Sequence, residues 1–277
     1  MNHAKLIFEE PLDGNSAWYV RSELPAPAGV CELMHLMGVA VDDPRLVDGI
    51  SVSTRRVRAG TALFHEGALA QAVYFVAVGT FKSLHIAEDG YEQVLGFAGR
   101  ADVLGYDAVC HGWHPTAAVA LEDSTVFTLA LSDLFTLCQR VPALDHALHL
   151  ILSRQLIHQL EIATLMAAVA AEVRLARFLV QLSEHMAERG QSPRRMLLRM
   201  TRRDIASHIG VAHETVSRSF SVLVQWGCLA VCGREIEILD LERLKACASS
   251  TRGLADAHVP HVCRSHPSVA SHQAACA

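Results

Sequence analysis

The sequence lacks a long hydrophobic run and lacks the features of an export signal. No uninterrupted apolar run is longer than that of residues 165–171, whereas a membrane-spanning helix needs about 20 such residues. The first ten residues, MNHAKLIFEE, carry acidic side chains where a signal peptide needs an apolar stretch. We therefore expect a cytoplasmic protein without a membrane segment.

Paired cysteine motifs and common catalytic motifs are also missing. None of the eight cysteines forms a C-x-x-C pair, so a disulfide framework is not expected in a reducing compartment. The chain has no phosphate-binding loop, no Gly-x-Gly-x-x-Gly turn and no recognisable Ser/His/Asp set. These absences argue against an enzyme, and the spacings assign no metal site.

Positive charge is scarce in the first half and concentrated in the second. Residues 51–140 carry six Lys and Arg against nine Asp and Glu, whereas residues 171–250 carry twelve against nine. Between Arg189 and Arg203 there is no acidic residue. A basic patch on an acidic protein is typical of local contact with a polyanion such as DNA.

The 277 residues, 51% of them hydrophobic, are enough for two modest domains with real cores. Residues 1–44 contain several prolines and no clear period, which predicts a partly disordered leader. Across residues 45–140, glycines separate short β-branched and aromatic runs, a pattern typical of a β-roll. With the helical remainder, this predicts an α+β fold.

Residues 141–170 predict one long helix. No glycine or proline occurs between 143 and 170, and leucines and isoleucines recur at helical spacing. A small β-roll cannot cover the whole apolar face of such a long helix. We therefore expect the uncovered part of this face to form the seam of a homodimer. His158 and Glu161 lie near this face and have no evident role in the sequence.

Residues 171–248 predict a winged helix-turn-helix. Thr201 and Asp204 have capping-box spacing, and Gly210 permits the tight turn before a second helix. In that helix Glu214, Ser217 and Arg218 share the face opposite the apolar residues. Arg218 suits guanine O6 and N7, Glu214 a cytosine amine, and Ser217 a thymine or a phosphate.

This order of β-roll, long helix and winged helix resembles the Crp/Fnr superfamily of bacterial transcription regulators. The resemblance covers about residues 45–248 and is closest to the Fnr branch through MTRRDIASHIG and ETVSR. It implies a homodimer that reads a TTGAT-like palindrome in double-stranded DNA through Glu214, Ser217 and Arg218. It also implies phosphate contacts from Thr201, Arg202 and Thr215, and contact with RNA polymerase, with residues 88–91 as a candidate surface. One departure is Ala212, where the family often has a Ser or Thr N-cap.

The superfamily's known effectors fit this sequence poorly. Its cyclic-nucleotide branch clamps phosphate with an arginine, but no Lys or Arg occurs between residues 101 and 139. The Fnr branch holds a 4Fe-4S cluster with three N-terminal cysteines and one in the β-roll. Here only Cys31 is left in the leader, and Phe127 stands at the β-roll position. Both effectors are therefore not expected, and the cofactor is unknown.

Other sensing chemistries stay open. Cys31, His35 and Met37 offer axial ligands for haem, which would make the protein a gas or redox sensor of the same fold. A second set of effector candidates lies in GYDAVCHGWHP: Cys110, His111 and His114. Regulation without a small effector is the leading option, through expression level or through oxidation of Cys228 or Cys232.

A metalloenzyme of cupin type is the rival class. Its β-barrel needs a His-x-His pair, because alternate residues of a strand face the same way. His111 and His114 instead have His-x-x-His spacing, so a strand points them apart, and His114-Pro115 is interpreted as a structural turn. The His- and Cys-containing tail, residues 249–277, is predicted to be disordered because Ser, Ala and Pro dominate it.

Overall fold

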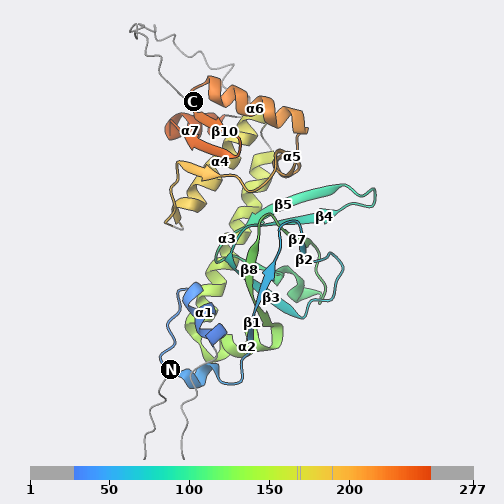
Figure 1. Cartoon of the computed structure of the whole chain (residues 1–277), viewed down its shortest axis with the longest axis vertical. Coiled ribbons are helices and arrows are strands. Elements are labelled where there is room, and N and C mark those ends of the chain that lie inside the picture. Colours follow the sequence, from blue (N-terminus) through green and yellow to red (C-terminus); the bar gives the residue numbers. More distant parts are fainter. Residues whose placement is uncertain (1–27, 167, 169, 189, 251–277) are drawn as a thin grey trace, which may run out of the picture.

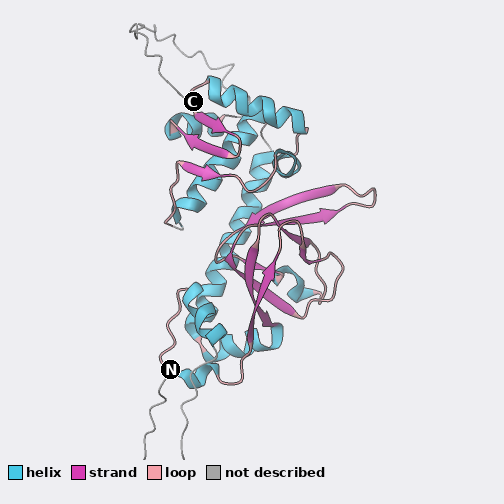
Figure 2. Ribbon diagram, in the orientation of Figure 1, coloured by secondary structure: helices cyan, strands magenta, loops and turns pink. Residues whose placement is uncertain are grey.

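The computed structural model describes residues 28–250 apart from residues 167, 169 and 189. A β-roll, a long helix and a C-terminal domain with a small sheet follow one another along the molecule (Figure 1). Figure 2 shows most of the strands in the roll, a smaller group of strands in the C-terminal domain, and helices between and around them. The predicted α+β fold is thus confirmed. Within these residues, no helix is long and apolar enough to cross a membrane.

The β-roll is made of two four-stranded antiparallel sheets, with strand orders β1-β8-β3-β6 and β2-β7-β4-β5. Its strands are β1 (Val52–Val57), β2 (Ala62–Phe64), β3 (Ala72–Val78), β4 (Phe81–Ile86), β5 (Glu92–Ala98), β6 (Val103–Leu104), β7 (Ala117–Ala120) and β8 (Ser124–Ala130). A short 3-10 helix, η2 (Tyr106–Cys110), follows β6. Strand β3 buries Val73, Phe75 and Val76, because β-branched and aromatic side chains fit a pleated surface.

The second part of the predicted leader is folded. Helix α1 (Ala28–Leu36) buries Val30, Leu33 and Met34, a set at helical spacing that the leader interpretation overlooked. Gly29 lets this helix approach β1, because a Cβ there would lie 2.6 Å from the Val52 carbonyl oxygen. A 3-10 helix, η1 (Pro44–Val47), precedes β1. The rest of the predicted leader, like most of the predicted tail, lies outside the described residues.

Helix α2 (Leu131–Arg140) leads into the long helix α3 (Pro142–Met166), which runs along the β-roll (Figure 1). Proline at the first position suits a helix start, since its missing N–H would have no partner there. One side of α3 buries Leu144 and Leu148 against the β-roll core. Another side leaves four large apolar residues exposed: Leu150, Leu156, Ile157 and Leu160.

The C-terminal domain surrounds its own hydrophobic core. Its elements are α4 (Ala171–Glu188), β9 (Arg195–Leu197), α5 (Arg202–Ile209), α6 (His213–Gln225), β10 (Leu229–Cys232), β11 (Glu235–Ile238) and α7 (Leu241–Ser249). The three strands form an antiparallel sheet in the order β10-β11-β9. The β10–β11 hairpin corresponds to the predicted wing, and β9 extends it.

Candidate DNA-binding interface and sensor domain

Local interactions determine where helix α5 begins and ends and where helix α6 begins. The hydroxyl of Thr201 accepts the Asp204 amide at 3.1 Å, and the Asp204 carboxylate accepts the Thr201 amide at 2.8 Å. This is the predicted capping box. Helix α5 ends at Gly210, whose φ of 65° is the left-handed conformation that favours glycine. The chain therefore turns sharply and starts α6 three residues later.

Helix α6 buries one face and exposes another. Val216, Phe220 and Leu223 are buried in the domain core. The exposed face carries the three predicted base-reading residues, Glu214, Ser217 and Arg218, together with Ser221. The N-cap is Ala212, which makes no capping hydrogen bond through its side chain. The face is thus an array of polar groups near the N-terminal end of the helix, the arrangement that reads base edges in a major groove.

The three residues predicted to contact phosphate differ in their surroundings. Arg202 is half-buried: its guanidinium lies 3.5 Å from the ring centroid of Phe220, and its Nη2 donates to the Gly233 carbonyl at 3.4 Å. Burial lowers the pKa of Arg202. The Thr201 hydroxyl donates to Asp204 at 2.6 Å. Both side chains therefore make contacts inside the domain, which the prediction of phosphate binding did not include. Thr215 is partly exposed on α6.

The predicted basic patch is only partly available to a ligand. Arg195 pairs with Glu237 at 3.0 Å, and Arg199 pairs with Glu122 of the β-roll at 3.1 Å. Arg203 on α5 is exposed, as is Arg218 on α6. Two arginines of the predicted patch thus form ion pairs within the fold.

The sensor candidates after strand β6 do not form one site. Cys110 and His111 are exposed, with the His111 ring stacked on Trp113 at 5.2 Å between centroids. His114 is 1% exposed and stacks on Phe64 at 3.9 Å. Burial lowers the pKa of His114 although Asp107 opposes it. The imidazole therefore fills the interior of the roll, in keeping with the structural turn inferred for His114.

The β-roll does not offer a cyclic nucleotide the groups it would need. The stretch between residues 101 and 139 brings no Lys or Arg to bind a phosphate. Gly105, between β6 and η2, lies so close to the buried His114 that a Cβ would be 2.9 Å from its Cε1 atom. The residues present therefore do not fit that ligand.

The leader candidates lie on or just after α1. Cys31 and His35 are exposed, and Met37 is partly buried against the core. The two exposed side chains are one helical turn apart, so they share a solvent-facing side of α1 rather than the wall of a haem pocket. With Cys31 exposed and Phe127 inside the core, the described cysteines do not fit a four-thiolate iron–sulfur cluster either.

The two redox candidates have opposite environments. Cys228 is fully buried, and burial raises the pKa of its thiol despite the nearby Arg243. A buried thiol with a raised pKa is inert, so the redox role predicted for Cys228 is wrong. The sequence position of Cys228 beside the wing suggested that its side chain was accessible, whereas it lies in the domain core. Cys232, at the end of β10, is exposed.

A contact between the β-roll and the helix-turn-helix escaped the sequence analysis. The β4–β5 hairpin lies against α5 (Figure 1). Lys82 Nζ pairs with the Asp204 carboxylate at 2.8 Å, and the Ser207 hydroxyl both donates to the Glu92 carbonyl and accepts the Val94 amide. Sequence spacing gave no signal for it, because the partners are more than a hundred residues apart.

Comparison with known proteins agrees with this architecture. Residues 54–141 match the cyclic nucleotide-binding domain family, and residues 173–247 match the Crp-like helix-turn-helix domain family. The chain is 36% identical over 209 residues to the fumarate and nitrate reduction regulatory protein of Salmonella typhimurium. That alignment covers 76% of this chain and 84% of the relative.

Solved structures show the same fold. FixK2 from Bradyrhizobium japonicum matches with a TM-score of 0.62 and 27% identity, covering 71% of this chain and 96% of FixK2. A mutant of CooA from Carboxydothermus hydrogenoformans matches with a TM-score of 0.64 and 21% identity, covering 78% and 95%. The chain has the β-roll and the helix-turn-helix of this fold, and its relatives are transcription regulators. It therefore belongs to the Crp/Fnr family of DNA-binding transcription regulators.

Proposed function

We propose that this regulator reads a TTGAT-like palindrome through Glu214, Ser217 and Arg218. The observation that carries the proposal is the exposed polar face of α6, with all three side chains at i, i+3 and i+4 spacing. Arg218 reads a guanine and Glu214 a cytosine, while Ser217 contacts a thymine or a phosphate. Phosphate contacts come from Thr215 and the exposed Arg203, in place of Thr201 and Arg202, whose side chains bond within the domain.

Replacement of Arg218 tests this interface. Arg218→Ala removes a bidentate guanine contact worth about 1–3 kcal/mol, so operator affinity should fall by about 5- to 150-fold at fixed salt. Arg56→Ala is the matched control, because it removes the same charge from the exposed face of β1. Equal operator binding by Arg218→Ala and wild type in a mobility-shift titration would contradict the proposal.

We also propose that the active form is a homodimer joined along α3. Leu156 and Leu160 are 69% and 68% exposed, which is unusual for two leucines one turn apart on a long helix. Two-fold pairing of α3 buries them and places two copies of α6 about 34 Å apart, one turn of DNA. Such a dimer works in the cytoplasm, binds RNA polymerase beside its operator, and has no enzymatic activity.

Charge substitutions in the seam test the dimer. Leu160→Glu should convert the dimer to a monomer in analytical ultracentrifugation, because an unpaired carboxylate would be buried in the seam. Leu239→Glu is the control, since Leu239 is 50% exposed in the C-terminal domain. A Leu160→Glu protein that sediments as the wild type does would rule out α3 as the seam.

A further inference from the structure

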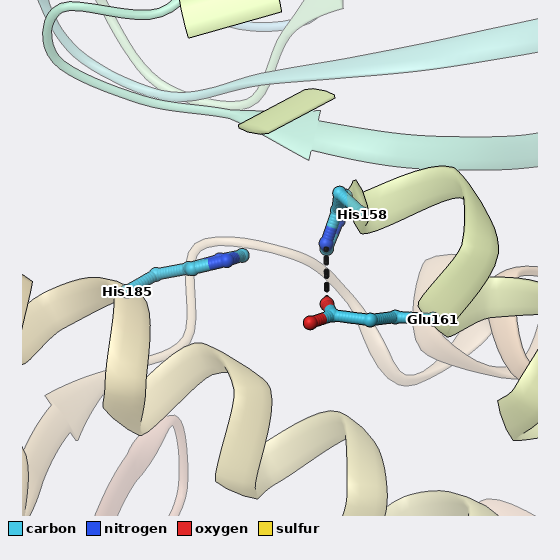
Figure 3. A group of neighbouring side chains, drawn as sticks. All are labelled: His158, Glu161 and His185. Carbon is cyan, nitrogen blue, oxygen red and sulfur yellow. Dashed lines mark hydrogen bonds and ion pairs between the residues drawn. The ribbon is translucent and has the colours of Figure 1, made fainter. Parts of the chain in front are cut away.

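A cluster of metal-binding side chains joins α3 to α4. His158 and Glu161 lie on α3 and His185 lies on α4, and Figure 3 shows the three side chains converging from the two helices. One ligand atom from each residue lies within 4.8 Å of the others. The rings of His158 and His185 are 5.0 Å apart between centroids. None of these residues belongs to the reading face or to the sensor candidates.

We propose that His158, Glu161 and His185 bind one divalent transition-metal ion of the zinc class. Two imidazoles and one carboxylate form a ligand set that suits zinc, with water in the fourth position. Tetrahedral zinc places its ligand atoms about 3.3 Å apart, given bonds of about 2.0 Å. His158 Nδ1 and Glu161 Oε2 already lie 3.2 Å apart, and His185 offers a ring nitrogen within 4.8 Å of a ligand atom of each. Binding of one ion therefore requires only that these atoms draw somewhat closer together.

The placement on two helices is what distinguishes this cluster from an ordinary helical ion pair. His158 and Glu161 are three residues apart, so they face the same side of α3. The pair of Asp145 and His149 has a comparable arrangement on the same helix, and among the residues that the structure describes no second histidine from another element joins it. The side chains of His158 and Glu161 are 24% and 37% exposed, so an ion can reach them from solvent.

The position of the site gives the ion a mechanical effect. Helix α3 ends at Met166 and α4, the first helix of the C-terminal domain, starts at Ala171. An ion bound by both helices therefore spans the short connection between the long helix and the DNA-binding domain. It restrains the angle between them and so changes operator affinity. This last step rests on the proposed function, whereas metal binding itself does not.

Cobalt titration of the full-length protein tests the site. Co²⁺ reports its ligands directly, because thiolate ligands give an intense charge-transfer band and a His/Glu set gives only weak d–d bands. After treatment with chelator, the wild type should bind one Co²⁺ with weak d–d bands and release it to Zn²⁺. His185→Gln and His158→Gln should each weaken this binding by more than about tenfold, since even an outer-shell residue contributes 10- to 100-fold.

His149→Gln is the matched control, because His149 is an exposed histidine of α3 beside a carboxylate. It should bind Co²⁺ as the wild type does. Cysteines elsewhere in the chain are the same in every variant, so any thiolate-bound metal appears equally in all of them. Equal non-thiolate binding by all variants, or none in the wild type, would overturn the proposal.

A second measurement separates the site from the DNA interface. Zn²⁺ should change the operator affinity of the wild type and of His149→Gln, and should leave that of His185→Gln unchanged. If the protein binds metal but no TTGAT-like operator, the proposed reading of DNA fails and the metal site stands. If it binds the operator but no metal at this cluster, the metal site fails alone.

Discussion

The ion pair between Lys82 and Asp204 should be one of the most costly to break in the molecule. The side chains are 15% and 9% exposed, and their charged atoms lie 2.8 Å apart across the contact between β4 and α5. Lys82→Met removes the cation and leaves a buried carboxylate. Loss of one partner from a buried pair typically costs about 3–5 kcal/mol. Because Asp204 keeps its bonds to Thr201, we expect the lower end, about 3 kcal/mol.

Urea unfolding of the full chain measures this cost. Lys245→Met is the matched control, because Lys245 pairs with Glu184 at a similar distance of 3.1 Å while the two side chains are 42% and 54% exposed. An exposed pair of this kind is worth less than about 1 kcal/mol. Similar losses of unfolding free energy in the two variants would refute the argument that burial makes the Lys82 pair strong.

The pair also has a defined pH dependence. Burial alone would raise the pKa of Asp204, but hydrogen bonds from Lys82 and Thr201 hold it below its ordinary value of 3.8. A carboxyl whose folded pKa is lowered stabilises the fold above its unfolded pKa, and this stabilisation is lost as the pH falls through the folded pKa. The difference in unfolding free energy between wild type and Lys82→Met should therefore be largest near neutral pH and should shrink in strong acid.

Three further outcomes follow from burial and backbone geometry. Burial, together with the charge of a neighbouring histidine, lowers the pKa of His208 to about 4. Because the unfolded chain then binds a proton more readily than the folded one, the unfolding free energy should fall by about 3 kcal/mol from pH 7 to pH 4, measured with chelator present. His208→Phe should remove most of that fall in calorimetric scans. Gly105→Ala should lower the melting temperature more than Gly112→Ala, since both have positive φ but only Gly105 has a buried imidazole where the Cβ would lie. A maleimide should label the exposed Cys232 in the native protein and leave the buried Cys228 unmodified, as peptide mass mapping would show.

The parts of the fold that follow from local sequence were predictable. The long helix α3 follows from the lack of glycine and proline after residue 142, and the faces of α6 follow from its 3.6-residue period. Gly210 marks a turn because only glycine readily takes the positive φ found there. In each case the residues that decide the structure lie within one or two helical turns of each other.

The features that the sequence did not predict correctly have one physical cause, which is contact between residues far apart in the chain. Cys228 was a redox candidate in the sequence, but its side chain is enclosed by the domain core. His158 and Glu161 had no evident role until α4 brought His185 to them. Helix α1 was hidden in a proline-rich leader, because its three buried residues matter only once β1 and α3 provide a core to receive them.

The β-roll holds the DNA-binding domain at several places, two of which bear on how a signal could reach DNA. One is the continuation of α3 into α4, and the other is the β4–β5 hairpin, which binds α5 through Lys82 and Ser207. Because α5 and α6 share one core, we expect them to move as a unit when either attachment shifts. A ligand can shift this equilibrium only by as much as it prefers one arrangement over the other, and about 1.4 kcal/mol of preference changes the population ratio tenfold. That is less than the cost expected for breaking the Lys82 pair, so a change in a single contact at this joint is large enough to alter operator binding.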